Sequence, residues 1–247
     1  MSSTKTEIIG HRGFAAIAPE NTLAGFRKAI EAGADSIELD LQLTADRVAV
    51  VFHDESLERT TGTTGKLREK SLEELKRLDA GRWKGAEFAG QQIPTFKEAL
   101  AQLKEITKFI YLDVKRYCHW EEKDIENLLE MISEAGLEEK CVVTSFNEEF
   151  VEKVGRCSGE IRLGYIVAKE SDYEMQLAKA SQREKTVMVS EYHLLLKKPA
   201  LIKASQNLGV EIVAWTVDSL EDMQKLEELG VRRIVTNCLI FKREEIS

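Results

Sequence analysis

The sequence predicts an α/β fold, a (β/α)8 TIM barrel with a small insertion after the β-hairpin that follows the second strand. Short β-rich runs alternate with amphipathic helical stretches along the chain, which is typical of a parallel sheet. The length of 247 residues fits one such barrel. No Ser/Gly-rich linker divides the chain, so we expect a single domain over residues 1–247. A doubly wound open sheet is the alternative, but no GxGxxG motif follows the first run.

The runs expected to form barrel strands are short and apolar, and a helical pattern or a long connection separates each from the next. They are Ile8–His11, Ser36–Leu43, Phe109–Lys115, Cys141–Phe146, Arg162–Val167, Thr186–Tyr192, Glu211–Val217 and Arg233–Asn237. The helical stretches lie near residues 22–32, 95–107, 121–135, 147–156, 171–181, 199–207 and 219–229. Several of these stretches end at a glycine, a common residue at helix C-termini.

One further run, Val48–His53, breaks the alternation. Only a tight turn at Ala45–Arg47 separates it from the preceding strand, and a parallel crossover needs a dozen residues or more. We therefore expect an antiparallel hairpin arm that brings His53 within a residue or two of Glu38.

The segment from about residue 55 to residue 93 has a loop-like composition with a short helical piece at Ser71–Leu78. We expect it to be an insertion over the carboxyl end of the barrel, where long loops often carry function.

Composition and charge exclude several classes of protein. The net charge is −8, from 35 basic and 43 acidic residues, which disfavours nucleic acid as a partner. No apolar run approaches the ~20 residues of a membrane span, and the polar N-terminus lacks the apolar stretch of a signal peptide. The four cysteines form no CxxC pair. These observations predict a soluble, reduced, cytoplasmic protein.

The most informative pattern is the presence of carboxylates on runs that should be apolar. In residues 37–43 the side chains alternate, so Glu38 and Asp40 share the face opposite the leucines and point into the barrel. Asp113 and Lys115 follow the same pattern on the next barrel run. A solvated edge strand is the structural alternative for any one such run. Three inward carboxylates without a His/Cys cluster favour a hard divalent cation, Mg²⁺ or Ca²⁺, over zinc.

Two histidines are expected to meet at the same end of the barrel. His11 ends the first run, and His53 arrives through the hairpin. Because imidazole titrates near neutral pH, the two are candidates for an acid–base pair, and a structural role for both is the alternative. Arg12 is suited to binding an anion, and Lys115 would add a second positive charge. Trp215 is a core residue or a substrate-binding surface, and we include it among the substrate-binding candidates.

Together these motifs resemble those of glycerophosphodiester phosphodiesterases. The resemblance extends over essentially the whole chain. The matching motifs are His11-Arg12-Gly13, Pro19-Glu20-Asn21-Thr22, Glu38-Leu39-Asp40, His53-Asp54, Arg59-Thr60-Thr61, Asp113-Val114-Lys115, Ser145-Phe146 and Trp215-Thr216-Val217.

The resemblance implies a TIM barrel that cleaves glycerophosphodiesters to sn-glycerol 3-phosphate and an alcohol, in glycerol and lipid metabolism. It also implies a divalent cation held by Glu38, Asp40 and Asp113, with His11 and His53 as acid and base. Arg12 and Lys115 would hold the phosphate of this small-molecule substrate. The oligomeric state stays open, with a homodimer as one candidate.

Three positions depart from the family pattern. Asp113 stands where Glu is usual, which shortens one ligand by a methylene. Arg47 replaces a glycine in the hairpin turn, where a positive φ is expected and local strain should follow. Asn237 stands where Asp is usual, and we expect little catalytic consequence from that change.

Three other functions are alternatives to this one. A lysophospholipase D would use the same site on a diester that still carries an acyl chain. A barrel glycosidase could use Glu38 and Asp113 as paired carboxylates, but it would need neither a cation nor two histidines. A non-catalytic binding protein is the third alternative.

Overall fold

The computed structural model describes residues 5–239, so residues 1–4 of the predicted polar N-terminus and residues 240–247 lie outside it. Eight parallel strands form a closed barrel, because β1 pairs with β9 on one side and with β2 on the other. The predicted (β/α)8 fold is confirmed. The barrel strands, in order around it, are β1 (Glu7–His11), β2 (Ser36–Leu43), β4 (Ile110–Val114), β5 (Cys141–Ser145), β6 (Arg162–Val167), β7 (Thr186–Glu191), β8 (Glu211–Trp215) and β9 (Arg233–Thr236).

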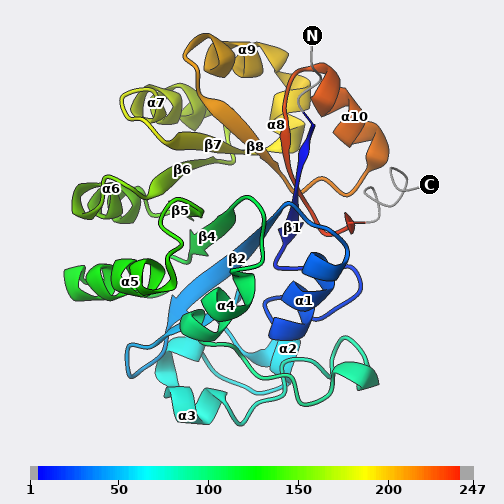
Figure 1. The fold of residues 1–247 in the computed structure, drawn as a ribbon, viewed down its shortest axis with the longest axis vertical. Coiled ribbons are helices and arrows are strands. Elements are labelled where there is room, and N and C mark those ends of the chain that lie inside the picture. Colours follow the sequence, from blue (N-terminus) through cyan, green and yellow to red (C-terminus); the bar gives the residue numbers. More distant parts are fainter. Residues whose placement is uncertain (1–4, 240–247) are drawn as a thin grey trace.

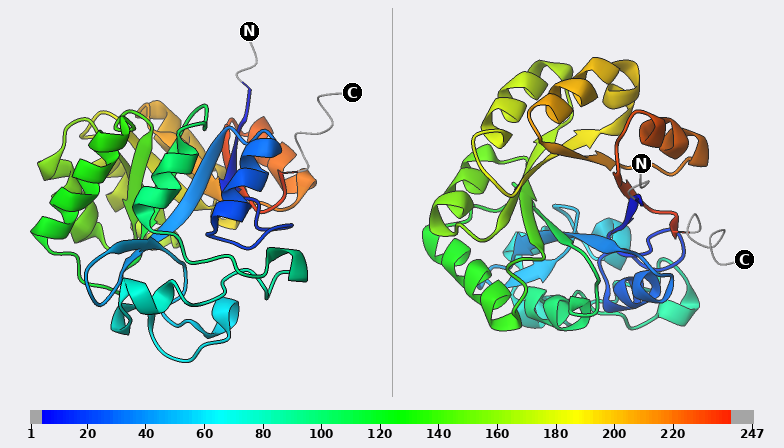
Figure 2. Two further views of the ribbon diagram at one scale, coloured as in Figure 1. Left: turned by 60° about the horizontal axis from the view of Figure 1, so that its bottom comes forward. Right: turned by 45° about the horizontal axis from the view of Figure 1, so that its top comes forward.

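Helices cover the outside of the barrel (Figures 1 and 2). They are α1 (Leu23–Glu31), α4 (Phe96–Leu103), α5 (Glu122–Ala135), α6 (Glu148–Cys157), α7 (Glu170–Ala180), α8 (Tyr192–Lys197), α9 (Pro199–Asn207) and α10 (Leu220–Glu228). Side-chain caps start several of them, as at Thr22 before α1 and Ser219 before α10, where a hydroxyl accepts a backbone N–H. Helix α8 was not predicted from the sequence. The expected strand through Tyr192 stops at Glu191, because the Glu191 carboxylate accepts the N–H groups of the next helix.

The alternation along β2 separates two environments. Ile37, Leu39 and Leu41 are fully buried in the layer between the barrel and its helices. Glu38 and Asp40 face the barrel interior and line a pocket at its end. Below them, a second apolar cluster that includes Ile9 and Val213 fills the barrel. The predicted inward direction of the two carboxylates is confirmed.

The expected hairpin is present. Strand β3 (Ala49–Val51) pairs antiparallel with β2, with Val51 opposite Leu41. The Phe52 N–H then donates to the Asp40 carbonyl at 3.0 Å. Extending this register brings His53 beside Leu39, one residue from Glu38. The prediction for His53 is therefore correct to within a residue.

The segment after the hairpin lies at the carboxyl ends of the barrel strands (cyan in Figure 2). Its short helices are α2 (Glu58–Thr61), η1 (Leu67–Glu69), α3 (Leu72–Leu75) and η2 (Ala86–Phe88). The sequence predicted only the third of these, and as a longer piece. A small separate core that includes Phe52, Leu67 and Ile93 holds the segment against β3.

All four cysteines are free. Among the helices of residues 5–239, none is both long and apolar enough to cross a bilayer.

Candidate active site

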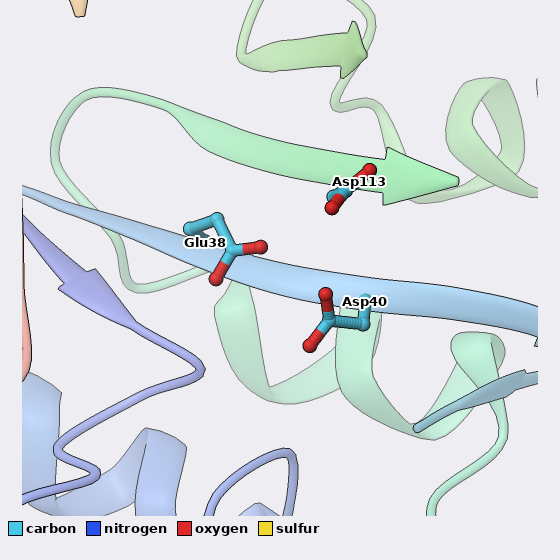
Figure 3. A group of neighbouring side chains, drawn as sticks. All are labelled: Glu38, Asp40 and Asp113. Atoms are coloured by element: carbon cyan, nitrogen blue, oxygen red, sulfur yellow. The ribbon is translucent and has the colours of Figure 1, made fainter. Parts of the chain in front are cut away.

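Three carboxylates meet at the carboxyl end of the barrel. Glu38 and Asp40 lie two residues apart on β2, and Asp113 is the register partner of Asp40 on β4. Figure 3 shows the three side chains directed toward one another. One oxygen from each lies within 4.8 Å of the others. A cation bound at about 2.0–2.6 Å has ligand atoms up to about 4–5 Å apart, so this spacing suits Mg²⁺ or Ca²⁺.

Two cations of the chain partly neutralise the cluster. Lys115 Nζ lies 2.7 Å from Asp40 Oδ1 and 2.5 Å from Asp113 Oδ2. Arg12 Nε lies 3.2 Å from Asp40 Oδ2, and the Arg12 backbone N–H donates to Glu38 at 3.0 Å. The second oxygen of Asp113, Oδ1, is buried with no hydrogen-bond partner among the described residues. An acceptor of this kind calls for a ligand, a cation or water.

The three carboxyl groups differ in their ionisation. Burial and the nearby Asp40 charge raise the pKa of Glu38 well above its usual value. Burial opposes the ionisation of Asp40 too, but Lys115 and Arg12 outweigh it and lower the pKa of that carboxyl. Burial raises the pKa of Asp113 despite the contact with Lys115. Asp40 is therefore the carboxyl group of the cluster that ionises most readily.

His11 lies at the rim of the cluster. Its Nε2 is 3.9 Å from Glu38 Oε2, and its Nδ1 is 2.8 Å from Asn237 Oδ1. Burial, together with the Arg12 charge, lowers the pKa of His11 to about 4. The ring is thus neutral at pH 7.

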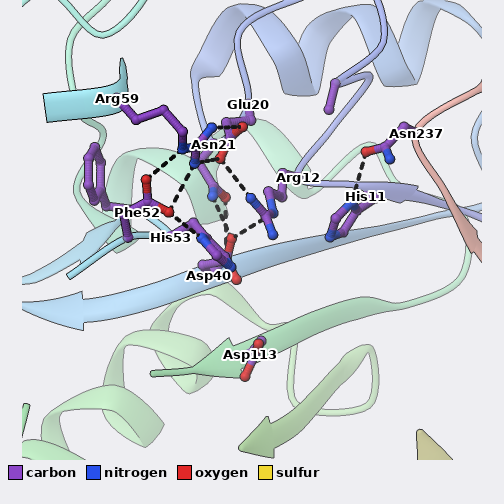
Figure 4. Close-up of polar contacts among 12 residues, drawn as sticks. His11, Arg12, Glu20, Asn21, Asp40, Phe52, His53, Arg59, Asp113 and Asn237 are labelled. Atoms are coloured by element: carbon purple, nitrogen blue, oxygen red, sulfur yellow. Dashed lines mark hydrogen bonds and ion pairs between the residues drawn. The ribbon is translucent and has the colours of Figure 1, made fainter. Parts of the chain in front are cut away.

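His53 reaches the same pocket from the hairpin side (Figure 4). Its Nδ1 lies 2.6 Å from Asp54 Oδ1, which leaves Nε2 as the nitrogen available to a substrate. Arg59 donates to both oxygens of Asp54, at 2.6 and 3.0 Å, and to both oxygens of Glu20. Glu20 in turn accepts from Arg12 Nη1 at 2.8 Å. This chain of contacts joins the hairpin to the loop after β1.

The backbone of that loop explains its motif. Arg12 has a φ of 54°, and Gly13 has a φ of 91°. A Cβ on Gly13 would meet the Gly25 carbonyl carbon at 2.7 Å, so only glycine fits beneath α1. Asn21 then holds Asp40 twice, with Nδ2 donating to the carboxylate at 2.6 Å and Oδ1 accepting the Asp40 N–H at 3.2 Å.

The far wall of the pocket is mostly apolar. Trp215 lines it and contacts Phe146 edge-on, with ring centroids 6.2 Å apart. Phe146 itself is 49% exposed. The structure thus brings all eight predicted site residues to one pocket: His11, Arg12, Glu38, Asp40, His53, Asp113, Lys115 and Trp215.

Five supporting residues received no role from the sequence: Glu20, Asn21, Asp54, Arg59 and Asn237. The first four stand inside the family motifs quoted above, and that position was the signal in the sequence that could have identified them. The fifth, Asn237, was expected to matter little, yet it contacts His11 directly.

Comparisons with known proteins agree with this geometry. A family model for glycerophosphoryl diester phosphodiesterases matches residues 11–239. A glycerophosphodiester phosphodiesterase of Caldanaerobacter subterraneus is 35% identical over 237 residues, which cover 94% of each chain. The human glycerophosphodiester phosphodiesterase 1 is 36% identical, in an alignment that covers 94% of this chain and 78% of the human one.

Solved structures give the same result. A phosphodiesterase from Oleispira antarctica, in complex with the product sn-glycerol 3-phosphate, has a TM-score of 0.87 at 27% identity, covering 97% of this chain and 96% of that one. A glycerophosphodiester phosphodiesterase from Agrobacterium tumefaciens has a TM-score of 0.78 at 28% identity, covering 95% of this chain and 97% of that one.

This site at the carboxyl ends of a closed barrel, together with the matches above, makes the chain a TIM-barrel phosphodiester hydrolase. The chain belongs to the glycerophosphoryl diester phosphodiesterase family, and its enzyme class is glycerophosphodiester phosphodiesterase.

Proposed function

We propose that this enzyme hydrolyses glycerophosphodiesters to sn-glycerol 3-phosphate and an alcohol, that it needs a divalent cation, and that His11 and His53 act as its acid and base. One observation carries the proposal: both histidines open onto the pocket that contains the three-carboxylate cluster. The product bound to the Oleispira antarctica phosphodiesterase supports a small-molecule substrate of this kind.

Glu38, Asp40 and Asp113 fit Mg²⁺ or Ca²⁺. All three donors are carboxylate oxygens, their spacing suits a hard cation, and one buried oxygen of Asp113 has no partner among the described residues. When bound, the cation would supply positive charge to the phosphoryl oxygens. Arg12 would add a planar cation at the same pocket, and Lys115 would keep Asp40 ionised.

The histidines supply the proton transfers. One accepts the proton of a glycerol hydroxyl while that oxygen forms a bond to phosphorus. The bond from phosphorus to the alcohol oxygen breaks, and the other histidine donates the proton to the leaving alkoxide. Water then opens the cyclic phosphate with the two roles reversed. Since each ring has Nδ1 held by a neighbour, Nε2 is the reacting nitrogen in both.

The test measures the release of glycerol 3-phosphate from glycerophosphocholine with a coupled assay. We expect exhaustive chelation to abolish turnover, and Mg²⁺ or Ca²⁺ to restore it. The variant Asp113→Asn removes the negative charge of one ligand, so it should need a higher cation concentration. Turnover that survives complete chelation would contradict the metal role of the cluster.

A lysophospholipase D activity is the second candidate. The apolar wall around Trp215 and Phe146 favours it, since that wall offers contact to an acyl chain. Turnover of lysophosphatidylcholine faster than glycerophosphocholine, measured by choline release from both, would favour this alternative. The cytoplasmic location and the absence of a nucleic-acid partner stay predictions, and a homodimer stays one candidate for the oligomeric state.

A further inference from the structure

The His11 ring forms a hydrogen bond, on the side away from Glu38, with a residue that follows another barrel strand. Asn237 directly follows β9, and its Oδ1 lies 2.8 Å from His11 Nδ1 (Figure 4). The two residues are 226 positions apart in the sequence. Closure of the barrel between β1 and β9 is what brings them together.

Asp218 fixes which way the Asn237 amide points. Asp218 Oδ2 accepts from Asn237 Nδ2 at 2.7 Å. Its other oxygen, Oδ1, accepts the Asn237 backbone N–H at 2.7 Å and the Thr236 hydroxyl at 3.0 Å. If the amide were turned over, its oxygen would face a carboxylate oxygen, and two acceptors would be in contact. The amide oxygen therefore faces His11.

This orientation determines where the His11 proton is. An amide oxygen can only accept, so His11 Nδ1 must carry a hydrogen. In the neutral ring, Nε2 then has the free lone pair, and Nε2 is the nitrogen on the side of Glu38.

We propose that Asp218 and Asn237 are positioning residues for His11, and that together they fix the ring and its tautomer with Nε2 directed into the pocket. The effect on rate rests on the proposed catalytic role of His11. The effect on the tautomer does not depend on that role.

The variant Asp218→Asn gives a sharp test. The backbone N–H of Asn237 cannot reverse, so the new amide must keep its oxygen at the Oδ1 site. Its NH2 group then faces the NH2 group of Asn237. Two donors cannot share a hydrogen bond, so the Asn237 amide turns over and offers NH2 to His11 Nδ1. We expect His11 to change to the tautomer with hydrogen on Nε2.

The double variant Asp218→Asn/Asn237→Asp should reverse this change. A carboxylate at position 237 accepts both from the new NH2 group and from His11 Nδ1–H. We expect kcat to fall on the order of 10²-fold in Asp218→Asn with little change in KM, and to recover most of that loss in the double variant. Damage to packing alone would not be repaired by a second polar substitution at the same contact.

The direct measurement is long-range ¹H–¹⁵N correlation spectroscopy of Mg²⁺-supplemented protein with ¹⁵N-labelled histidine. It is recorded near pH 8.5, about two units above the ordinary imidazole pKa, so that neutral rings dominate. His11→Ala assigns the signal, and the exposed His119 and His193 serve as internal controls. Thermal unfolding checks that each variant is folded.

A switch of the His11 tautomer in Asp218→Asn, reversed in the double variant, supports the proposal. An unchanged tautomer, or a double variant that does not revert, overturns it. If His11→Ala retains full activity, the catalytic role of His11 fails instead, and the tautomer measurement still decides the positioning role.

Discussion

Lys115 and Asp40 form a buried ion pair, with Nζ 2.7 Å from Oδ1 and the Asp40 side chain only 1% exposed. Lys115 directly follows β4, and Asp40 lies in the middle of β2. The lysine predicted to bind phosphate therefore also balances the charge of the acidic cluster. This double position has a consequence for stability.

We expect Lys115→Met to lower the free energy of unfolding by about 3 kcal/mol in the presence of chelator, because it leaves a buried carboxylate less well paired. A bound cation would replace the lost charge. Mg²⁺ should therefore raise the melting temperature of the variant more than that of the wild type. Calorimetry measures the melting temperatures with and without Mg²⁺. An equal rise in the variant and in the wild type would contradict a cation at this cluster.

Substitution of the two pocket histidines should affect activity, whereas substitution of an exposed histidine should not. We expect His11→Ala and His53→Ala each to lower kcat by about 10²–10⁴-fold without unfolding the protein, since each removes a proton-transfer group. His119→Ala is the matched control and should keep full activity, because its side chain is exposed and outside the pocket. Steady-state kinetics with glycerophosphocholine measure the effect. Full activity in either pocket variant would exclude that histidine as acid or base.

Arg47 illustrates how the chain accommodates one departure from the family pattern. It adopts a φ of 62°, as expected for a turn where glycine is usual, and its Nε donates to Asp124 at 3.0 Å. Arg47→Ala loses the ion pair and keeps the strained φ, whereas Arg47→Gly loses the pair and relieves the strain. We expect the alanine variant to be less stable than the glycine variant by about 1 kcal/mol in urea unfolding. An alanine variant as stable as the glycine variant would show that φ carries no cost here.

Asp79 should make the insertion sensitive to acid. Its carboxylate accepts the N–H groups of Gly90, Arg82 and Gly81, which lowers its pKa below the value in an unfolded chain. Stability from such a group is fully present above the unfolded pKa of about 4 and is lost as the pH falls through the folded pKa.

The measurement is hydrogen exchange of residues 80–91, corrected for intrinsic rates. Protection in the wild type should be constant from neutral pH down to about pH 4 and should fall below it. Asp79→Asn should show lower protection at neutral pH and no such fall. Parallel curves for the two proteins would mean that Asp79 does not hold this segment.

Much of the site was readable from the sequence because a strand imposes a period of two. Glu38 and Asp40 lie between leucines that must face the helices, so their direction into the barrel follows from local geometry. His53 could be brought near Glu38 because a three-residue turn leaves only one way to pair the next run. These predictions needed only short-range rules.

Other features depended on contacts that no local rule encodes. Glu191 ends β7 and caps α8, whereas β propensity alone extends the strand to Tyr192. Glu20 and Asn21 stand in a family motif but received no role from the sequence, and the structure shows that they contact Arg12 and Asp40 through hydrogen bonds.

The barrel class, the carboxylate face of β2 and β4, and the family to which the chain belongs all follow from the amino-acid sequence. Only the tertiary structure shows which partners come from other strands: Asp40 beside Lys115, and Asn237 beside His11. The physical reason is strand pairing. Pairing of β2 with β4, and closure of the barrel between β1 and β9, set side chains from distant parts of the chain at hydrogen-bond distance, which the spacing of residues along the chain cannot specify.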